Sequence, residues 1–215
     1  GIAYSSNWAD GVVAVDIGAK KHKEADRSKS QFNPLLAKAG QGSPSNPIKL
    51  AEMKDPTGRN HAAFPYTSES TGQFYIVGGD ENFPWGVMAT KNKPSNPRGA
   101  YHFLNFTDPE NPTEDAIYEV PEAGSHNLWI YGDMLLAGNY QGGFRVVDIS
   151  GELLGDIYKQ GREIAHYLSY HEKGRIANAP MVWGAQPYKD YIFFSDMNSG
   201  LYCVQLEEES SSSTD

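Results

Sequence analysis

The sequence predicts an all-β protein, a β-propeller built from four-stranded blades. Two observations lead to this prediction: a glycine-hinged pair of apolar strands recurs along the chain, and two copies are separated by the length of one blade. Of the 215 residues, 39% are hydrophobic and 21% are charged, so the chain can bury a core. We expect blades over residues 1–207 and a solvated acidic, serine-rich tail at 208–215.

Four segments share one pattern: an apolar strand, a polar turn containing glycine, and a second apolar strand that ends near Asp or Asn. Aligned on the glycine that opens the second strand, the hinges fall at Gly11, Gly99, Gly143 and Gly200. Gly99 and Gly143 are 44 residues apart (143 − 99), which matches a propeller blade of about 40–45 residues. Glycine suits these hinges because hairpin turns often need a positive φ.

The longer spacings between the other hinges require insertions. The sequence has three such stretches. Residues 20–47 are charged and then rich in Gly, Ser and Pro, residues 85–98 are rich in Pro and Asn, and residues 158–178 are longer than an ordinary loop between strands. We expect a short helix around residues 161–172 in the third insertion. Outer strands are expected at 48–53 and 116–120, and inner strands are expected to start near His61, Ser125 and Asn178.

About four blades fit into the chain, the first without its innermost strand and the last without its outermost strand. Closed rings of four blades lie at the small end of the propeller range. We therefore expect this chain to be part of a larger ring, which upstream sequence or another chain completes.

Charge and cysteine content exclude several classes of protein. The chain has 27 Asp and Glu against 18 Lys and Arg, a formal net charge of −9, which argues against binding nucleic acid or an anionic membrane. No apolar run reaches the ~18–20 residues that a membrane-spanning helix needs. A single cysteine, Cys203, allows no internal disulfide, and its place inside a strand predicts a buried, inert thiol.

The segment GGFRVVDISGELLGDIYKQGREI, from Gly142 to Ile164, resembles the LVIVD-repeat proteins. Phe144–Asp148 and Val12–Asp16 match the repeat core of that family, whereas Asn105 and Gln205 replace its terminal Asp. The resemblance implies a β-propeller that is often exported in bacteria and has no established common activity. It therefore also implies an extracellular or periplasmic location.

Two histidines stand at matching places in the predicted blades. His61 and His126 precede inner strands of consecutive blades, and Asn178 begins the inner strand of the next one. Innermost strands line the channel of a propeller, so side chains at one level converge on its axis. Two imidazoles and an amide there could hold a metal ion or a small anion. Together with Glu81, which follows a strand in the blade of His61, these residues would supply nitrogen and oxygen ligands for a divalent metal ion. The alternative is that they cap strand starts and hydrogen-bond the backbone or buried water.

The sequence contains no known catalytic motif, neither G-x-S-x-G nor a P-loop nor H-E-x-x-H. The first hypothesis is therefore a non-catalytic binding or scaffold module, whose insertions dock other protein chains in an exported or cell-surface assembly. The second is a metal-dependent enzyme, a hydrolase or an oxidoreductase, with its site in the central channel. The third is a structural component of a cell-surface assembly, packed edge to edge in many copies.

Overall fold

The computed structural model describes residues 1–21, 32–54, 56–86 and 93–207, and this part of the chain forms four small β-sheets. The described residues contain one short 3-10 helix, η1 (Pro34–Ala37), so the predicted all-β class is confirmed. The predicted tail at 208–215 and parts of the first two insertions lie outside the described residues. The strands, sheet by sheet, are β1 (Ile2–Ser6), β2 (Val12–Asp16) and β3 (Ile48–Met53); β4 (Asn60–Thr67), β5 (Phe74–Asp80), β6 (Tyr101–Asn105), β7 (Thr113–Tyr118) and β11 (Gly155–Asp156); β8 (Leu128–Tyr131), β9 (Met134–Gly138), β10 (Phe144–Asp148) and β12 (Glu163–Tyr167); β13 (Val182–Tyr188), β14 (Tyr191–Asp196) and β15 (Gly200–Val204).

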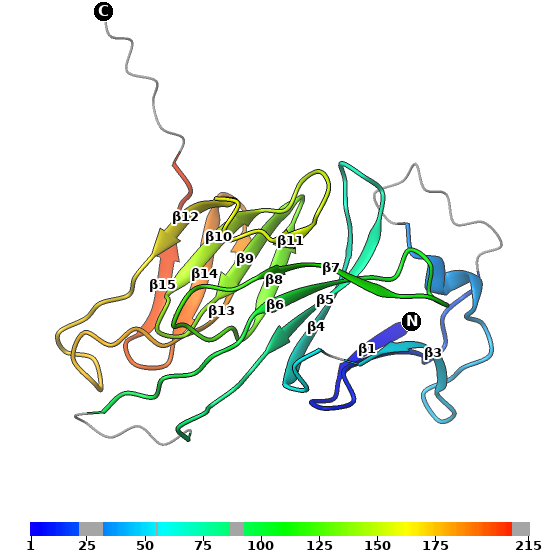
Figure 1. Ribbon diagram of the computed structural model, residues 1–215, viewed down its shortest axis with the longest axis horizontal. Helices are drawn as coiled ribbons and strands as arrows, with labels where there is room; N and C mark the ends of the chain where they lie inside the picture. The colour runs from blue at the N-terminus through cyan, green and yellow to red at the C-terminus, as the bar shows by residue number, and fades with distance from the viewer. Residues whose placement is uncertain (22–31, 55, 87–92, 208–215) are drawn as a thin grey trace, which may run out of the picture.

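Each sheet is an antiparallel meander whose strands pair in chain order, apart from β11, which returns to pair parallel with β7. Consecutive sheets meet along their first strands: β1 contacts β4, β4 contacts β8, and β8 contacts β13. As a result β1 and β3 lie at one end of the long axis of the molecule and β15 lies toward the other (Figure 1).

The four predicted hinges adopt the left-handed backbone conformation that favours glycine. Their φ angles are +78° at Gly11, +142° at Gly99, +79° at Gly143 and +108° at Gly200. Each hinge lies within two residues of the start of the strand that it opens, which is β2, β6, β10 or β15. The sequence pattern therefore located the same hairpin in all four sheets.

The hinge is the same turn in the first and third sheets. The Asn7 N–H donates to the Gly11 carbonyl at 2.8 Å, and the Asn139 N–H donates to the Gly143 carbonyl at 2.9 Å. The residue after each asparagine, Trp8 or Tyr140, has a positive φ and bridges to a strand of the following sheet. This turn thus closes a hairpin and also ties one sheet to the next.

The polar residue that ends the repeat core has a common role in three sheets. A side-chain oxygen of Asp16, Asn105 or Asp148 accepts a hydrogen bond from the backbone N–H two residues later, at 2.8–2.9 Å. This Asx turn leads the chain out of the sheet. Asparagine can make the same bond as aspartate, so the departure from the repeat core at Asn105 leaves the turn intact.

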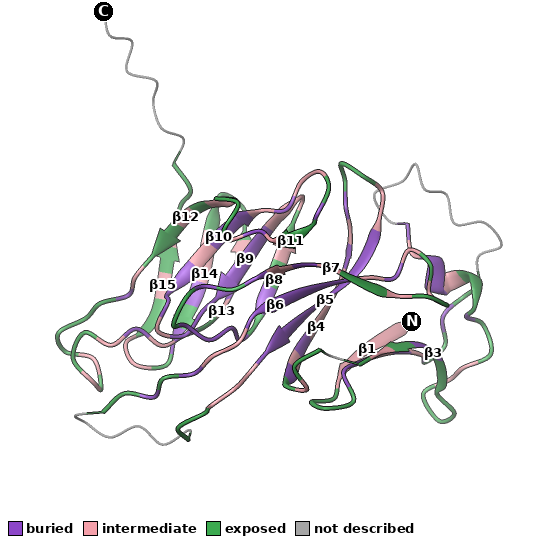
Figure 2. Cartoon of the chain, viewed as in Figure 1, coloured by how far each residue is buried: buried purple, intermediate pink, exposed green. Residues whose placement is uncertain are grey.

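A separate hydrophobic core lies between each pair of consecutive sheets. Val12 and Leu50 pack with Phe74 between the first two sheets. Further cores join the second to the third sheet, around Phe103, and the third to the fourth, around Phe194. β5 is buried along its whole length, whereas β12 and β15 at the periphery carry many exposed residues (Figure 2).

Two predictions for the second half of the chain are wrong. Residues 163–167 form the strand β12 and no helix covers 161–172, because β12 pairs with β10 and satisfies its outer backbone groups. The inner strand of the fourth sheet begins at Val182 and not near Asn178. By contrast, the outer strand predicted at 48–53 matches β3, and that predicted at 116–120 corresponds to β7.

Cys203 is exposed, contrary to the buried thiol that the sequence predicts. Tyr202 and Val204 turn toward the core that joins the third and fourth sheets. Cys203 and Leu201 alternate with them and so face the other side of β15, which no described sheet covers. The pattern of apolar residues identified the strand correctly but could not show that one of its faces is open.

Candidate functional site

His61 enters the site from the start of β4, where two hydrogen bonds from the first sheet fix its backbone. The carbonyl of Asn60 accepts from the Trp8 N–H at 2.9 Å, and the carbonyl of His61 accepts from the Ser6 hydroxyl at 2.7 Å. The imidazole itself is turned toward Glu81, with His61 Nδ1 3.3 Å from Glu81 Oε2. The ring is thus held at the junction of the first and second sheets.

Glu81 directly follows β5 and points away from its neighbour Asp80. Asp80 Oδ2 accepts from the Thr57 hydroxyl at 2.8 Å and lies 3.1 Å from Nε2 of the buried His102. His102 also contacts Glu114 through Nδ1. Since successive residues of an extended chain face opposite sides, only Glu81 of the acidic pair reaches His61.

His126 comes from the segment before β8 and is anchored on three sides. Its N–H donates to the Gly138 carbonyl at 2.9 Å, and the preceding Ser125 hydroxyl donates to the Asp80 carbonyl at 2.7 Å. Its Nδ1 lies 2.9 Å from the Trp183 carbonyl. A carbonyl can only accept, so Nδ1 carries a proton and Nε2 is left facing Glu81.

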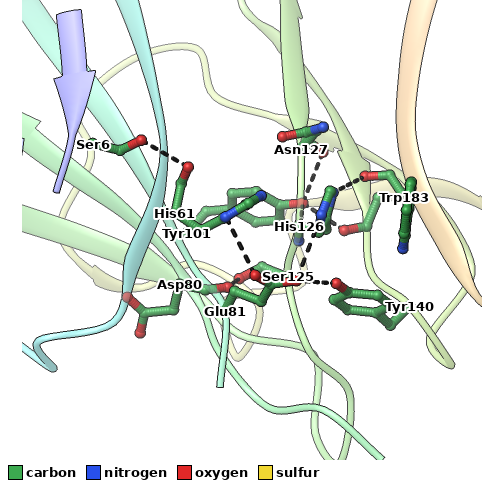
Figure 3. A network of polar contacts seen from close by, with 11 residues as sticks. Ser6, His61, Asp80, Glu81, Tyr101, Ser125, His126, Asn127, Tyr140 and Trp183 are labelled. Carbon is green, nitrogen blue, oxygen red and sulfur yellow. Dashed lines mark hydrogen bonds and ion pairs between the residues drawn. The ribbon is translucent and has the colours of Figure 1, made fainter. Parts of the chain in front are cut away.

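His61, Glu81 and His126 form a compact group that we call the His–Glu cluster (Figure 3). His126 Nε2 lies 3.6 Å from Glu81 Oε1, and one ligand atom of each residue lies within 4.8 Å of the others. Metal bonds of about 2.0–2.1 Å in a tetrahedral site separate two ligand atoms by roughly 3.4 Å. The two carboxylate–imidazole distances, 3.3 and 3.6 Å, fit that spacing.

Burial and neighbouring charge favour the neutral form of His126. Burial is the main cause that lowers its pKa, and the nearby His61 lowers it further, whereas Glu81 and the Trp183 carbonyl oppose the shift. Tyr140 donates its hydroxyl to Glu81 Oε1, and burial followed by this bond raises its pKa well above its usual range. Glu81 Oε1 therefore accepts a hydrogen bond from the Tyr140 hydroxyl and also faces His126 Nε2, an imidazole nitrogen that is itself an acceptor.

The structure brings together three of the four predicted ligands and leaves the fourth outside. Asn178 lies in the loop before β13, where its N–H donates to the His171 carbonyl at 3.1 Å. Two supporting residues, Tyr140 and Trp183, were not predicted. Tyr140 could have been found by aligning the hinge turns, because it occupies the position of Trp8 in the turn of the first sheet. No pattern in the sequence indicates that the Trp183 carbonyl would accept a hydrogen bond from His126.

Two cavities flank the His–Glu cluster. One, of about 550 Å³, is lined by Glu81 and Tyr140 together with Trp8 and Trp183, and we call it the aromatic pocket. The other, of about 580 Å³, is lined by His61 and by residues of the first strands of all four sheets. The cluster is therefore reached from two sides and is not sealed in the core.

Comparisons with known proteins identify no relative. No family model matches the sequence, and neither a curated protein nor a solved structure matches the chain. Among the residues that the structure describes, no helix has the length and apolar character to cross a bilayer.

Proposed function

We propose that the chain is a run of consecutive propeller blades with a divalent metal site at its inner edge. The meandering sheets, their contacts along first strands and the core between each neighbouring pair support a radial stack of blades. The first and last sheets have three strands each, as blades at the ends of a run would if further sheets complete the ring. The resemblance to LVIVD-repeat proteins points to the same architecture.

The observation that leads to the metal site is the His–Glu cluster. Two imidazoles and one carboxylate from different segments of two sheets converge with the spacing of metal ligands. Two further hydrogen bonds support it: the Nδ1–H of His126 donates to the Trp183 carbonyl, and the Tyr140 hydroxyl donates to the carboxylate of Glu81. In metal sites, hydrogen bonds between the ligating side chains and the groups around them orient the ligands.

Three protein ligands leave a coordination position open, which is typical of catalytic metal sites and not of structural ones. The aromatic pocket, which Glu81 lines, gives a small molecule access to this side of the cluster. A metal ion there would polarise a bound group or activate water, chemistry that serves a hydrolase or an oxidoreductase. We therefore favour the metal-dependent enzyme.

Metal titration of the purified chain tests this function. We expect one Zn²⁺ to bind, and Glu81→Gln and His126→Ala to weaken binding by about 100-fold or more, since even outer-shell changes cost 10–100-fold. His166→Ala is the matched control, because His166 pairs with Glu163 at 3.0 Å on an exposed strand outside the cluster. If His166→Ala weakens binding as much as His126→Ala, or if no metal binds, the metal site is refuted.

A second candidate, the binding or scaffold module, is favoured by the open face of the fourth sheet. Leu201 is 74% exposed and Tyr188 is 63% exposed, and Tyr191 and Cys203 are exposed as well. Their side chains form an apolar surface where the next blade, or another chain of the same assembly, would pack. Light scattering tests this role: association at high protein concentration should be lost in Leu201→Lys, whereas a monomeric wild type would argue against it.

A further inference from the structure

The aromatic pocket has the size and lining of a small-molecule site. Its volume of about 550 Å³ falls in the range of roughly 300–1,000 Å³ that ligand pockets occupy. Trp8, Phe83 and Trp183 supply aromatic surface, and Met181 and Met197 supply adaptable apolar surface. Such walls favour a ligand with a flat apolar body.

One wall of the pocket is held in place by the side chain of Asn198. Its oxygen accepts from the Ile176 N–H at 2.6 Å, and its nitrogen donates to the carbonyls of Ile176 and Ala179 at 2.7 and 2.9 Å. The Arg175 N–H donates to the carbonyl of Asn198 at 3.0 Å. Arg175, whose side chain is exposed at the pocket, is therefore presented on a fixed loop.

The charges at the pocket select the class of ligand. This step rests on the proposed metal site, because a divalent ion bound by Glu81 and two neutral imidazoles leaves one net positive charge. Arg175 adds a second positive charge at the same pocket. We infer that the aromatic pocket binds a small organic anion with a planar apolar body, of which an aromatic carboxylate is the simplest example, with the anionic group directed to the metal.

Calorimetric titration with 1-naphthoate tests the inference, after Zn²⁺ binding has been measured on its own. We expect 1-naphthoate to bind the zinc-loaded chain and to bind the metal-free chain at least about tenfold more weakly. Equal affinity for both forms would overturn the inference while leaving the metal site intact. Failure of Zn²⁺ to bind in the first titration would instead overturn the proposed function.

A cationic probe and a pair of variants complete the test. Arg175→Gln should weaken 1-naphthoate binding several-fold without changing the affinity for Zn²⁺. Lys189→Gln removes an exposed positive charge from the turn between β13 and β14, outside the pocket, and it should change neither the affinity for 1-naphthoate nor that for Zn²⁺. Tighter binding of 1-naphthylmethylamine than of 1-naphthoate would overturn the inference, because the pocket would then be an aromatic cage for cations.

Discussion

At the scale of single residues, the buried carboxylate of Asp16 is the most heavily bonded group of the repeat core. It accepts hydrogen bonds from the N–H groups of Gly18, Ala19, Gly40, Gln41 and Gly42. Asp16→Asn places an NH₂ donor against several of these N–H donors, so we expect the midpoint of thermal unfolding to fall by several degrees. Asp148→Asn should have little effect, because the main bond of Asp148 is the single Asx-turn bond that Asn105 makes naturally. Equal effects of the two changes would contradict this account.

The same carboxylate predicts how stability depends on pH. The Gly42 and Ala19 N–H groups hold the pKa of Asp16 well below its usual range. A carboxyl whose pKa is lower in the folded than in the unfolded chain stabilises the fold above its unfolded pKa of about 3.9, and this contribution is lost as the pH falls further. Wild type and Asp16→Asn should therefore differ by a constant amount from pH 5 to 8 and converge below about pH 4 in thermal melts.

Tyr140 should tune the proposed metal site without forming part of it. Tyr140→Phe removes the hydroxyl that donates to Glu81 and keeps the ring, which packs against Phe83 and His126. We expect Zn²⁺ affinity to fall by about tenfold, measured by competition with a chelator, while the unfolding midpoint changes little. Unchanged affinity would show that Tyr140 serves packing alone.

The alignment of strands predicted the site residues that lie in a strand or within two residues of one. His61 and His126 converge because each stands where the chain enters a sheet, and Glu81 joins them because it directly follows β5, the strand that pairs with β4. Asn178 was predicted to begin the inner strand of the fourth sheet. It lies instead in a loop with its own hydrogen bonds, which separates it from the start of β13. Sequence position fixes where a strand points but not the path of a long loop.

At the scale of elements, the hinge residue Gly143 must be glycine for two reasons that substitution can separate. A Cβ on Gly143 would lie 2.4 Å from the Tyr167 carbonyl oxygen of the neighbouring strand, and φ there is +79°. Gly151 has a φ of +67° and no atom within 4 Å of its Cβ position. Gly151→Ala should cost about 1 kcal/mol in unfolding free energy for backbone strain alone.

Gly143→Ala should cost at least about 3 kcal/mol, because β12 must also shift away from β10. Urea unfolding of the two variants measures the difference. Equal losses would mean that the close approach of β12 is not a constraint. The hinge pattern was visible in the sequence because a positive φ at one residue favours glycine there. β12 was missed because its pairing with β10 depends on tertiary structure and not on the local sequence.

At the scale of the whole molecule, each sheet contacts its neighbours and shares one core with each of them. Stacked units of this kind have stabilities set by nearest-neighbour interfaces. A defect in one core should therefore loosen the sheets that share it and leave distant sheets protected. The same organisation explains why the end sheets expose apolar surface that an inner sheet would bury.

Phe194→Ala provides the test of this modular organisation. Phe194 is buried between the last two sheets and stacks on Phe144 and Tyr202, at ring-centroid distances of 5.2 and 4.9 Å. Its truncation should cost about 3–5 kcal/mol locally. Hydrogen exchange should accelerate in β13–β15 and stay slow in β5 and β6. Phe103→Ala, in the core between the second and third sheets, should give the opposite pattern. Uniform acceleration in both variants would show that the four sheets unfold as a single unit, which would contradict the sheet-by-sheet organisation of stability.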